Sequence, residues 1–152
     1  MEKNEVKSIT FTYAETQGLS KWLADAMLHG TELRSRNRIV DILIKQLQEF
    51  DKVRIEIVKK YAELDKKTKE PLMNEDGQTF KMKDTLGFQK EWLETLEAAN
   101  FTFDILPSNL LDWGNVKTII LNLKKDFNYA DGMIYSSICD KFEEKQETKK
   151  DK

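Results

Sequence analysis

Few residues in this chain are suited to covalent or acid–base chemistry. His29 is the only histidine and Cys139 the only cysteine, so no internal disulfide can form. A serine or cysteine nucleophile activated by histidine would have to use His29. His29 precedes Gly30, where a helix C-terminus would favour a partly cationic imidazole, and we therefore interpret it as a capping residue. Cys139 has apolar neighbours and is predicted to be a small core side chain.

Carboxylates are the remaining candidates for metal binding or acid–base catalysis. Residues 74–76, Asn-Glu-Asp before Gly77, faintly resemble a calcium loop but lack the alternating ligands and terminal Glu of an EF-hand. A hairpin turn is the better interpretation. Glu94 and Glu97 share a predicted helix face with Lys90, where solvation or ion pairing explains them. We therefore predict no catalytic residue, no bound metal, no cofactor and no enzymatic activity.

Three arginines at the start of a long predicted helix, Arg34, Arg36 and Arg38, are the best candidates for a partner-binding site. Cations there face the positive end of the helix dipole, which costs a few tenths of a kcal/mol each unless an anion offsets it. That anion could be internal, such as Asp25, Asp41 or the glutamates of a later helix. Internal ion pairs are the favoured explanation, and the alternative is an external anion, either an acidic protein surface or a phosphate.

The spacing of the arginines separates their expected roles. Arg34 and Arg38 lie one helical turn apart and share a face, whereas Arg36 points elsewhere, so binding should depend more on the first two. A nucleic-acid site would need interleaved aromatic residues, and the formal net charge is -2, from 25 Lys and Arg against 27 Asp and Glu. We expect a protein partner rather than a nucleic acid.

The long helix is predicted over residues 31–64, a stretch without Pro or Gly. Its apolar residues follow helical spacing and form one stripe: Val40, Leu43, Leu47, Phe50, Ile57, Tyr61 and Leu64. At 1.5 Å per residue the helix would span about 50 Å, longer than a domain of this size is wide. Part of it is expected to project or to carry an interface, and pairing with a second copy in a homodimer is one alternative.

Shorter elements precede and follow this helix. Residues 8–13 alternate apolar and polar side chains as a half-buried strand does, and residues 19–28 predict a helix with Leu19, Trp22 and Met27 facing the core. After the long helix we expect an Asp76-Gly77 hairpin, a helix from about 85 to 99 with Phe88, Trp92, Leu93 and Leu96 inward, a strand over 101–106, a turn over 108–112, a helix over 115–127 and a helix capped by Asp131.

Together these elements predict a predominantly helical α+β fold. It comprises one long central helix, three or four shorter helices, a small antiparallel sheet from the two strands, and an Asp-Gly hairpin. Residues 1–146 are expected to form a single domain and residues 147–152 a flexible charged tail. No apolar run approaches the ~20 residues that span a bilayer, so no membrane association is expected.

The pattern resembles a small family of unknown function encoded by tailed bacteriophages of Gram-positive bacteria. The resemblance covers roughly residues 7–123 and rests on three pieces: Lys60-Tyr61-Ala62-Glu63, the Asp76-Gly77 turn and the strand end Asp104-Ile105-Leu106-Pro107. It implies a phage origin and a scaffold but no active site.

The expected function is a non-enzymatic, protein-binding accessory or assembly factor acting through surface complementarity. The alternative is a small phage inhibitor that binds and blocks a host defence complex. The partner would be a phage or host protein. The protein would act in the bacterial host cytoplasm during infection or as part of the virion.

Overall fold

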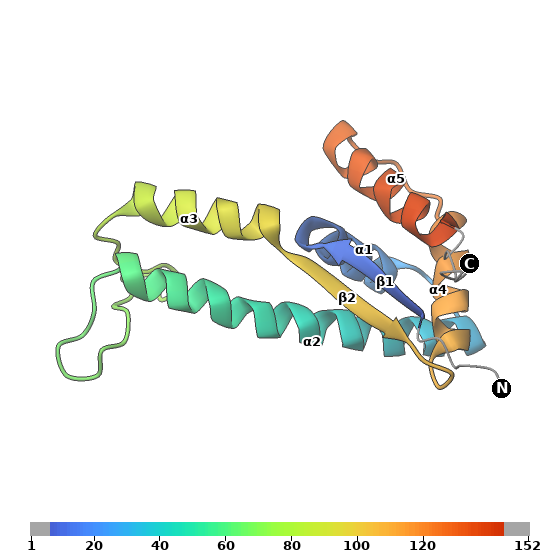
Figure 1. Ribbon diagram of the computed structural model, residues 1–152, viewed down its shortest axis with the longest axis horizontal. Helices are drawn as coiled ribbons and strands as arrows, with labels where there is room; N and C mark the ends of the chain where they lie inside the picture. Colours follow the sequence, from blue (N-terminus) through green and yellow to red (C-terminus); the bar gives the residue numbers. More distant parts are fainter. Residues whose placement is uncertain (1–6, 145–152) are drawn as a thin grey trace, which may run out of the picture. The chain divides into compact units, whose positions relative to one another are not determined.

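The computed structural model describes residues 7–144, which fold into five helices and two strands (Figure 1). In chain order these are β1 (Lys7–Thr12), α1 (Tyr13–Asp25), α2 (Gly30–Tyr61), α3 (Thr85–Ala98), β2 (Asn100–Ile105), α4 (Leu110–Leu121) and α5 (Tyr129–Glu143). The predicted α+β class, with one long helix and a small sheet, is confirmed. The charged tail predicted at residues 147–152 lies outside the described residues.

The chain divides into two compact units, and α2 contributes residues to both. We call the described parts of residues 1–46 and 100–152 the sheet unit, because they contain both strands. Residues 47–99, which contain the end of α2, the Asp-Gly turn and α3, are the hairpin unit. The expectation of a single domain over residues 1–146 stays a prediction.

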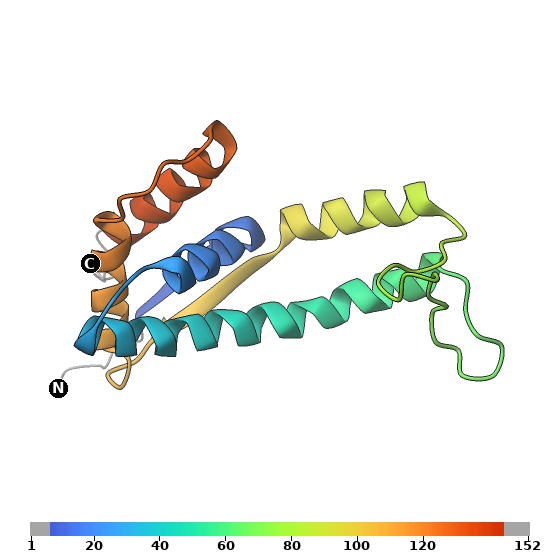
Figure 2. The ribbon, with the colours of Figure 1, turned by 180° about the vertical axis from the view of Figure 1, so that it is seen from behind.

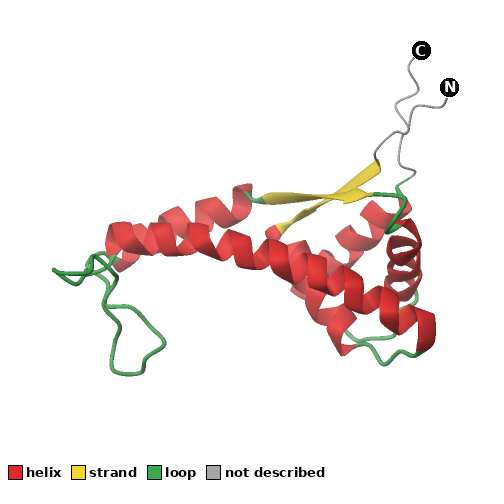
Figure 3. Ribbon diagram, turned by 90° about the horizontal axis from the view of Figure 1, so that it is seen from below, coloured by secondary structure: helices red, strands yellow, loops and turns green. Residues whose placement is uncertain are grey.

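The sheet forms because both strands alternate apolar and polar residues. β1 and β2 pair antiparallel, with Ile9 opposite Phe103 and Phe11 opposite Phe101, and these four side chains are buried. Their polar neighbours face outward, and the hydroxyls of Thr10 and Thr102 lie 2.8 Å apart across the strands. Figure 3 shows the two strands side by side with the helices of the sheet unit on one face. The two predicted strands and their pairing are confirmed.

Aromatic side chains fill the core beneath the sheet. The ring of Phe11 lies 5.6 Å from that of Phe142 on α5, and the ring of Trp113 on α4 lies 6.0 Å from that of Phe103. Phe11 is completely buried, as are Leu19, Leu23, Leu43 and Ile138. Such contacts join all three shorter helices of this unit to the inner face of the sheet.

Helix α1 begins six residues earlier than the predicted helix over 19–28 and ends three residues earlier. Thr12 caps it, because its hydroxyl accepts from the Glu15 amide while the Glu15 carboxylate accepts from the Thr12 amide. The sequence interpretation assigned Thr12 to the strand and missed this capping box. Because α1 ends at Asp25, Met27 lies beyond it and is 97% exposed, so the prediction that Met27 faces the core was wrong.

The C-terminal helices also begin earlier than predicted. Helix α4 starts at Leu110, so the predicted turn over 108–112 and helix over 115–127 are replaced by one helix over 110–121. Helix α5 is capped by Asn128, whose side chain accepts from the Asp131 amide, so Asp131 lies in the first turn rather than at the cap.

The hairpin unit pairs the second half of α2 with α3 (Figure 2). Asp84 caps α3 by accepting from the Gly87 amide at 2.9 Å. The rings of Phe50 and Trp92 are 5.7 Å apart between the two helices. No side chain of α3 is fully buried, and Leu93, predicted to face inward, is 55% exposed. The apolar stripe of α2 is buried at Leu43 and Ile57 but only half-buried at the intervening Leu47 and Phe50.

Between α2 and α3 the chain forms three extended segments, each hydrogen-bonded to the other two. The Glu63 amide donates to the Lys81 carbonyl, the Lys81 amide to the Leu72 carbonyl, and the Leu72 amide to the Glu63 carbonyl, each at 2.8 Å. The predicted Asp76-Gly77 turn closes this loop, with Gly77 at a φ of 67° that glycine adopts at little cost. The Asp76 carboxylate accepts from the Gln78 and Thr79 amides.

Candidate partner-binding site

Arg36 holds the end of helix α1. Its Nη1 donates to the carbonyl oxygens of Leu23 at 2.8 Å and of the C-cap residue Ala26 at 2.9 Å, and the Leu23 carbonyl also accepts from the Ala26 amide at 3.2 Å. A cation at this position is also favoured by the negative end of the helix dipole. The prediction gave this capping role to His29, which was wrong, because His29 is exposed and lies four residues past the end of α1.

Arg38 joins a buried polar network between α2 and α4. Its Nη1 lies 3.4 Å from Asp112 Oδ1, and the same oxygen accepts from the Ser35 hydroxyl at 2.8 Å. The Ser35 hydroxyl in turn accepts from the Asn115 amide at 2.9 Å. Ser35 and Asp112 are buried, whereas the Arg38 side chain stays 56% exposed. Arg38 therefore offers its outer nitrogen atoms to solvent.

The anion beside Arg38 was not among those considered from the sequence. Asp41, one of the expected partners, pairs instead with Lys45 at 2.9 Å. Asp112 lies 74 residues from Arg38, and no local pattern links the two positions. Asp112 is recognisable in the sequence as an acidic residue in the first turn of a helix. The helix dipole favours an acidic residue there even without a cationic partner, so this position does not point to Arg38.

Arg34 differs from the other two arginines. It is exposed, and among residues 7–144 its side chain makes no hydrogen bond or ion pair. It lies one turn before Arg38 on α2, so the two guanidinium groups share a face, as the spacing predicted. Arg36 points away from them toward α1. The structure thus separates one structural arginine from two that reach solvent.

An exposed leucine lies on α4, the helix that Ser35 and Arg38 contact through Asp112. Leu111, in the first turn of α4, is 68% exposed and sits one turn before Asn115 on the same helix face. Asn115 contacts Ser35 on α2, and Leu111 directly precedes Asp112, whose carboxylate pairs with Arg38. Figure 2 shows the start of α4 beside the first turns of α2. We call Arg34, Arg38 and Leu111 the Arg–Leu patch.

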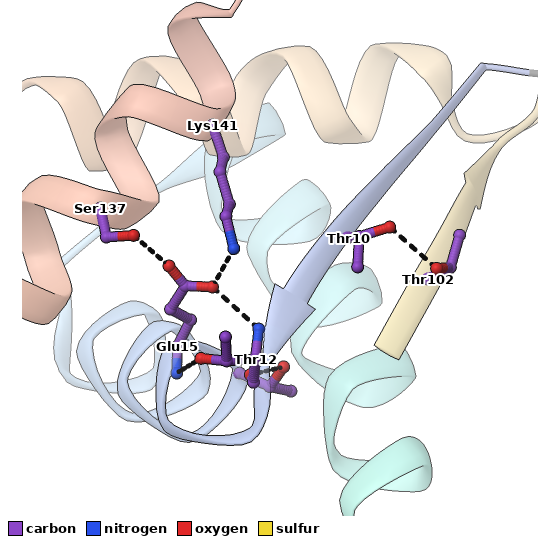
Figure 4. Close-up of polar contacts among 7 residues, drawn as sticks. Thr10, Thr12, Glu15, Thr102, Ser137 and Lys141 are labelled. Carbon is purple, nitrogen blue, oxygen red and sulfur yellow. Dashed lines mark hydrogen bonds and ion pairs between the residues drawn. The ribbon is translucent and has the colours of Figure 1, made fainter. Parts of the chain in front are cut away.

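A second polar cluster joins α1 to α5 (Figure 4). The buried Glu15 carboxylate accepts from the Thr12 amide, the Ser137 hydroxyl and the Lys141 ammonium. Burial acts to raise the pKa of Glu15, but the hydrogen bonds from Lys141, Ser137 and Thr12 outweigh it and hold the pKa below its ordinary value. All three donors are engaged with the Glu15 carboxylate, so the cluster stabilises the packing of α5.

The hairpin unit has a more exposed polar cluster. Glu91 accepts from Lys60 and from the Tyr61 hydroxyl, each at 2.8 Å. These hydrogen bonds lower the pKa of Glu91. The cluster links the last turn of α2 to α3.

Cys139 is half-buried on α5, and burial raises the pKa of its thiol. Burial likewise raises the pKa of the neighbouring Tyr135 to about 12, and the Tyr135 hydroxyl donates to the Ile120 carbonyl at 2.6 Å. A thiol with a raised pKa is protonated at neutral pH and is a poor nucleophile. Its surroundings therefore agree with the predicted packing role.

Neither a metal cluster nor a membrane span is found in the described part of the chain. Across residues 7–144, no group of three or more His, Cys, Asp or Glu side chains is placed to hold a metal ion. Within that range no helix combines the length and apolar character needed to cross a bilayer. Comparisons with protein-family models, curated proteins and solved structures found no match to this chain.

Proposed function

We propose that this protein is a non-enzymatic accessory or assembly factor of a tailed phage that binds another protein through the Arg–Leu patch. The observation that carries this proposal is the state of Arg34, which is exposed and has no side-chain partner among residues 7–144. A guanidinium group without an internal partner is available to pair with an external carboxylate. The phage origin rests on the sequence resemblance alone.

The chemistry of the patch favours an acidic protein segment that also carries apolar side chains. Guanidinium groups bind carboxylates in a planar, two-pronged geometry, and Arg38 has only Nη1 engaged with Asp112. Leu111 adds apolar surface that a phosphate backbone would not cover. The exposed carboxylate of Asp41 lies three residues from Arg38, which disfavours a polyanion such as nucleic acid.

The test combines capture of a partner with matched variants. The tagged protein is incubated with lysate of infected host cells, captured proteins are identified by mass spectrometry, and binding of the purified partner is then measured against salt. We expect Arg34→Ala and Leu111→Ser each to weaken binding about tenfold, in line with the loss of one interface contact. The arginine variant should also reduce the salt dependence.

The control removes two positive charges elsewhere on α2. Lys45→Ala combined with Lys52→Ala alters side chains that are 72% and 74% exposed and should leave binding unchanged. Arg34→Ala is preferred to Arg38→Ala because Arg38 also pairs with the buried Asp112. Wild-type affinity in the Arg34→Ala and Leu111→Ser variants would refute the patch. A captured host defence protein would instead favour the inhibitor alternative.

A further inference from the structure

We infer that this protein self-associates through the outer face of α3, with the α3 helices of two copies packed antiparallel. The outer face consists of Leu86, Lys90, Leu93 and Glu97, which recur every three or four residues and so lie on one stripe. Leu86 is 78% exposed and Leu93 is 55% exposed. Two leucines seven residues apart form an apolar ridge of the kind that helices pack against one another.

The opposite face of α3 is already engaged within the hairpin unit. Trp92 meets Phe50, and Glu91 accepts from Lys60 and Tyr61, all on α2. Leu86 and Leu93 lie on a different side of the helix from Trp92 and Glu91, so they face away from α2. A group that buries these two leucines must therefore come from a separate molecule or from a part of the chain outside the hairpin unit.

The stripe is self-complementary when two copies run antiparallel. With a two-fold axis between Gln89 and Lys90, Leu86 of each copy faces Leu93 of the other, because both lie the same distance from the axis. An interface formed by one patch on both copies closes after two subunits and gives a dimer rather than a filament. The same stripe in a parallel pair would set Lys90 against Lys90 and Glu97 against Glu97, which repel.

Charge supports the antiparallel arrangement independently. Lys81 and Lys83 precede the first turn of α3, whereas Glu94 and Glu97 lie near its C-terminal end, where the helix dipole disfavours carboxylates. All four side chains are exposed. In the antiparallel dimer, Glu94 and Glu97 of one copy meet the lysines and the positive helix end of the other. The occupant best matched to this face is thus a second copy of the chain.

The contact is small, and the dimer is therefore concentration-dependent. Helix α3 has 14 residues and is about 21 Å long, so the pair buries less than a standard interface. The surface lies in the hairpin unit and shares no residue with the Arg–Leu patch. The experiments can consequently support or refute self-association and partner binding independently of each other.

The first test is analytical ultracentrifugation of the full chain from micromolar to millimolar concentration. We expect the mass to rise from monomer to dimer and the combined variant Leu86→Gln, Leu93→Gln to stay monomeric over the same range. The matched control, Met27→Gln with Met133→Gln, changes two residues of the sheet unit that are 97% and 56% exposed and should dimerise as the wild type does. Circular dichroism verifies that each variant is folded.

The second test fixes the orientation. The double charge reversal Glu94→Lys, Glu97→Lys should weaken the dimer about tenfold, because several exposed ion pairs are lost. Adding Lys81→Glu and Lys83→Glu to this variant should restore the affinity. In a Cys139→Ser background, protein with Lys83→Cys mixed with protein with Glu97→Cys should form a disulfide-linked heterodimer, whereas neither should cross-link alone.

Three outcomes would overturn the inference. A monomer mass at every concentration would remove the dimer. Unchanged dimerisation of the Leu86→Gln, Leu93→Gln variant would place the interface elsewhere. Cross-linking of the Glu97→Cys protein to itself, without cross-linking to the Lys83→Cys protein, would show a parallel pair.

Discussion

The sheet unit and the hairpin unit bury their side chains to very different extents. Among residues 7–144, sixteen of the nineteen buried hydrophobic residues belong to the sheet unit, and the hairpin unit contributes Ile57, Val58 and Ala62. The five buried polar residues of the same range also lie in the sheet unit. Since apolar burial is the main favourable term in folding, the sheet unit should carry most of the stability and the hairpin unit should open more readily.

The polar cluster of the sheet unit is also more deeply buried than that of the hairpin unit. Glu15 is buried and joins two helices and a strand, whereas Glu91 is half-exposed and joins two helices. A charge-assisted hydrogen bond contributes more in a water-poor site, and removing one partner there leaves a buried group unsatisfied. The comparison shows that two hydrogen-bonded glutamates stabilise the fold to different degrees, depending on how deeply each carboxylate is buried.

The largest expected effect tests the difference in core packing. Phe11→Ala should lower the free energy of unfolding by about 3 to 5 kcal/mol, because it leaves a cavity between Phe103 and Phe142. Phe50→Ala should cost less, since Phe50 is only half-buried against Trp92. Chemical denaturation monitored by circular dichroism measures both. Equal losses would show that the hairpin unit is as tightly packed as the sheet unit.

An intermediate effect concerns acid stability. Glu15→Gln should cost about 2 to 3 kcal/mol at neutral pH, because the Lys141 ammonium loses the buried carboxylate that pairs with it. The native pKa of Glu15 is lowered, so its stabilising contribution is full above the unfolded pKa of about 4.3 and is lost as the pH falls through the lower native value. The variant should therefore lose less stability between neutral and acidic pH than the wild type.

The control for the acid prediction is Glu91→Gln in the hairpin unit. Glu91 also has a lowered pKa, but its position is more open to solvent, so the change in the unfolding midpoint should be smaller than for Glu15→Gln. Melting curves recorded across acidic to neutral pH give both comparisons. An acid response that Glu15→Gln leaves unaltered would argue against the role assigned to the Glu15 cluster.

The smallest effect separates the arginines within the sheet unit. Arg36→Ala should lower the free energy of unfolding by about 1 to 2 kcal/mol, because the carbonyls of Leu23 and Ala26 lose their hydrogen bonds from the guanidinium group. Arg34→Ala should change it by less than about 0.5 kcal/mol, as exposed substitutions usually do. Urea titration of the two variants provides the measurement. A larger loss for Arg34→Ala than for Arg36→Ala would reverse their assigned roles.

Part of the site could be predicted from the sequence. The shared face of Arg34 and Arg38 follows from their spacing of four, and Arg36 points away as expected. The role of Arg36 could not be predicted, because its acceptors are carbonyls at the end of another helix, and the sequence placed that helix end too late. Leu111 was missed because the sequence assigned it to a turn rather than to a helix.

The sequence by itself determined the local elements. The period-two strands, the apolar stripe of α2, the Asp84 cap and the Asp76-Gly77 turn each depend on residues close together in the chain. Only the tertiary structure decided which distant groups meet, such as Ser35 with Asp112 and Glu15 with Lys141. These pairs are separated by 77 and 126 residues, and their meeting depends on how all the intervening helices pack.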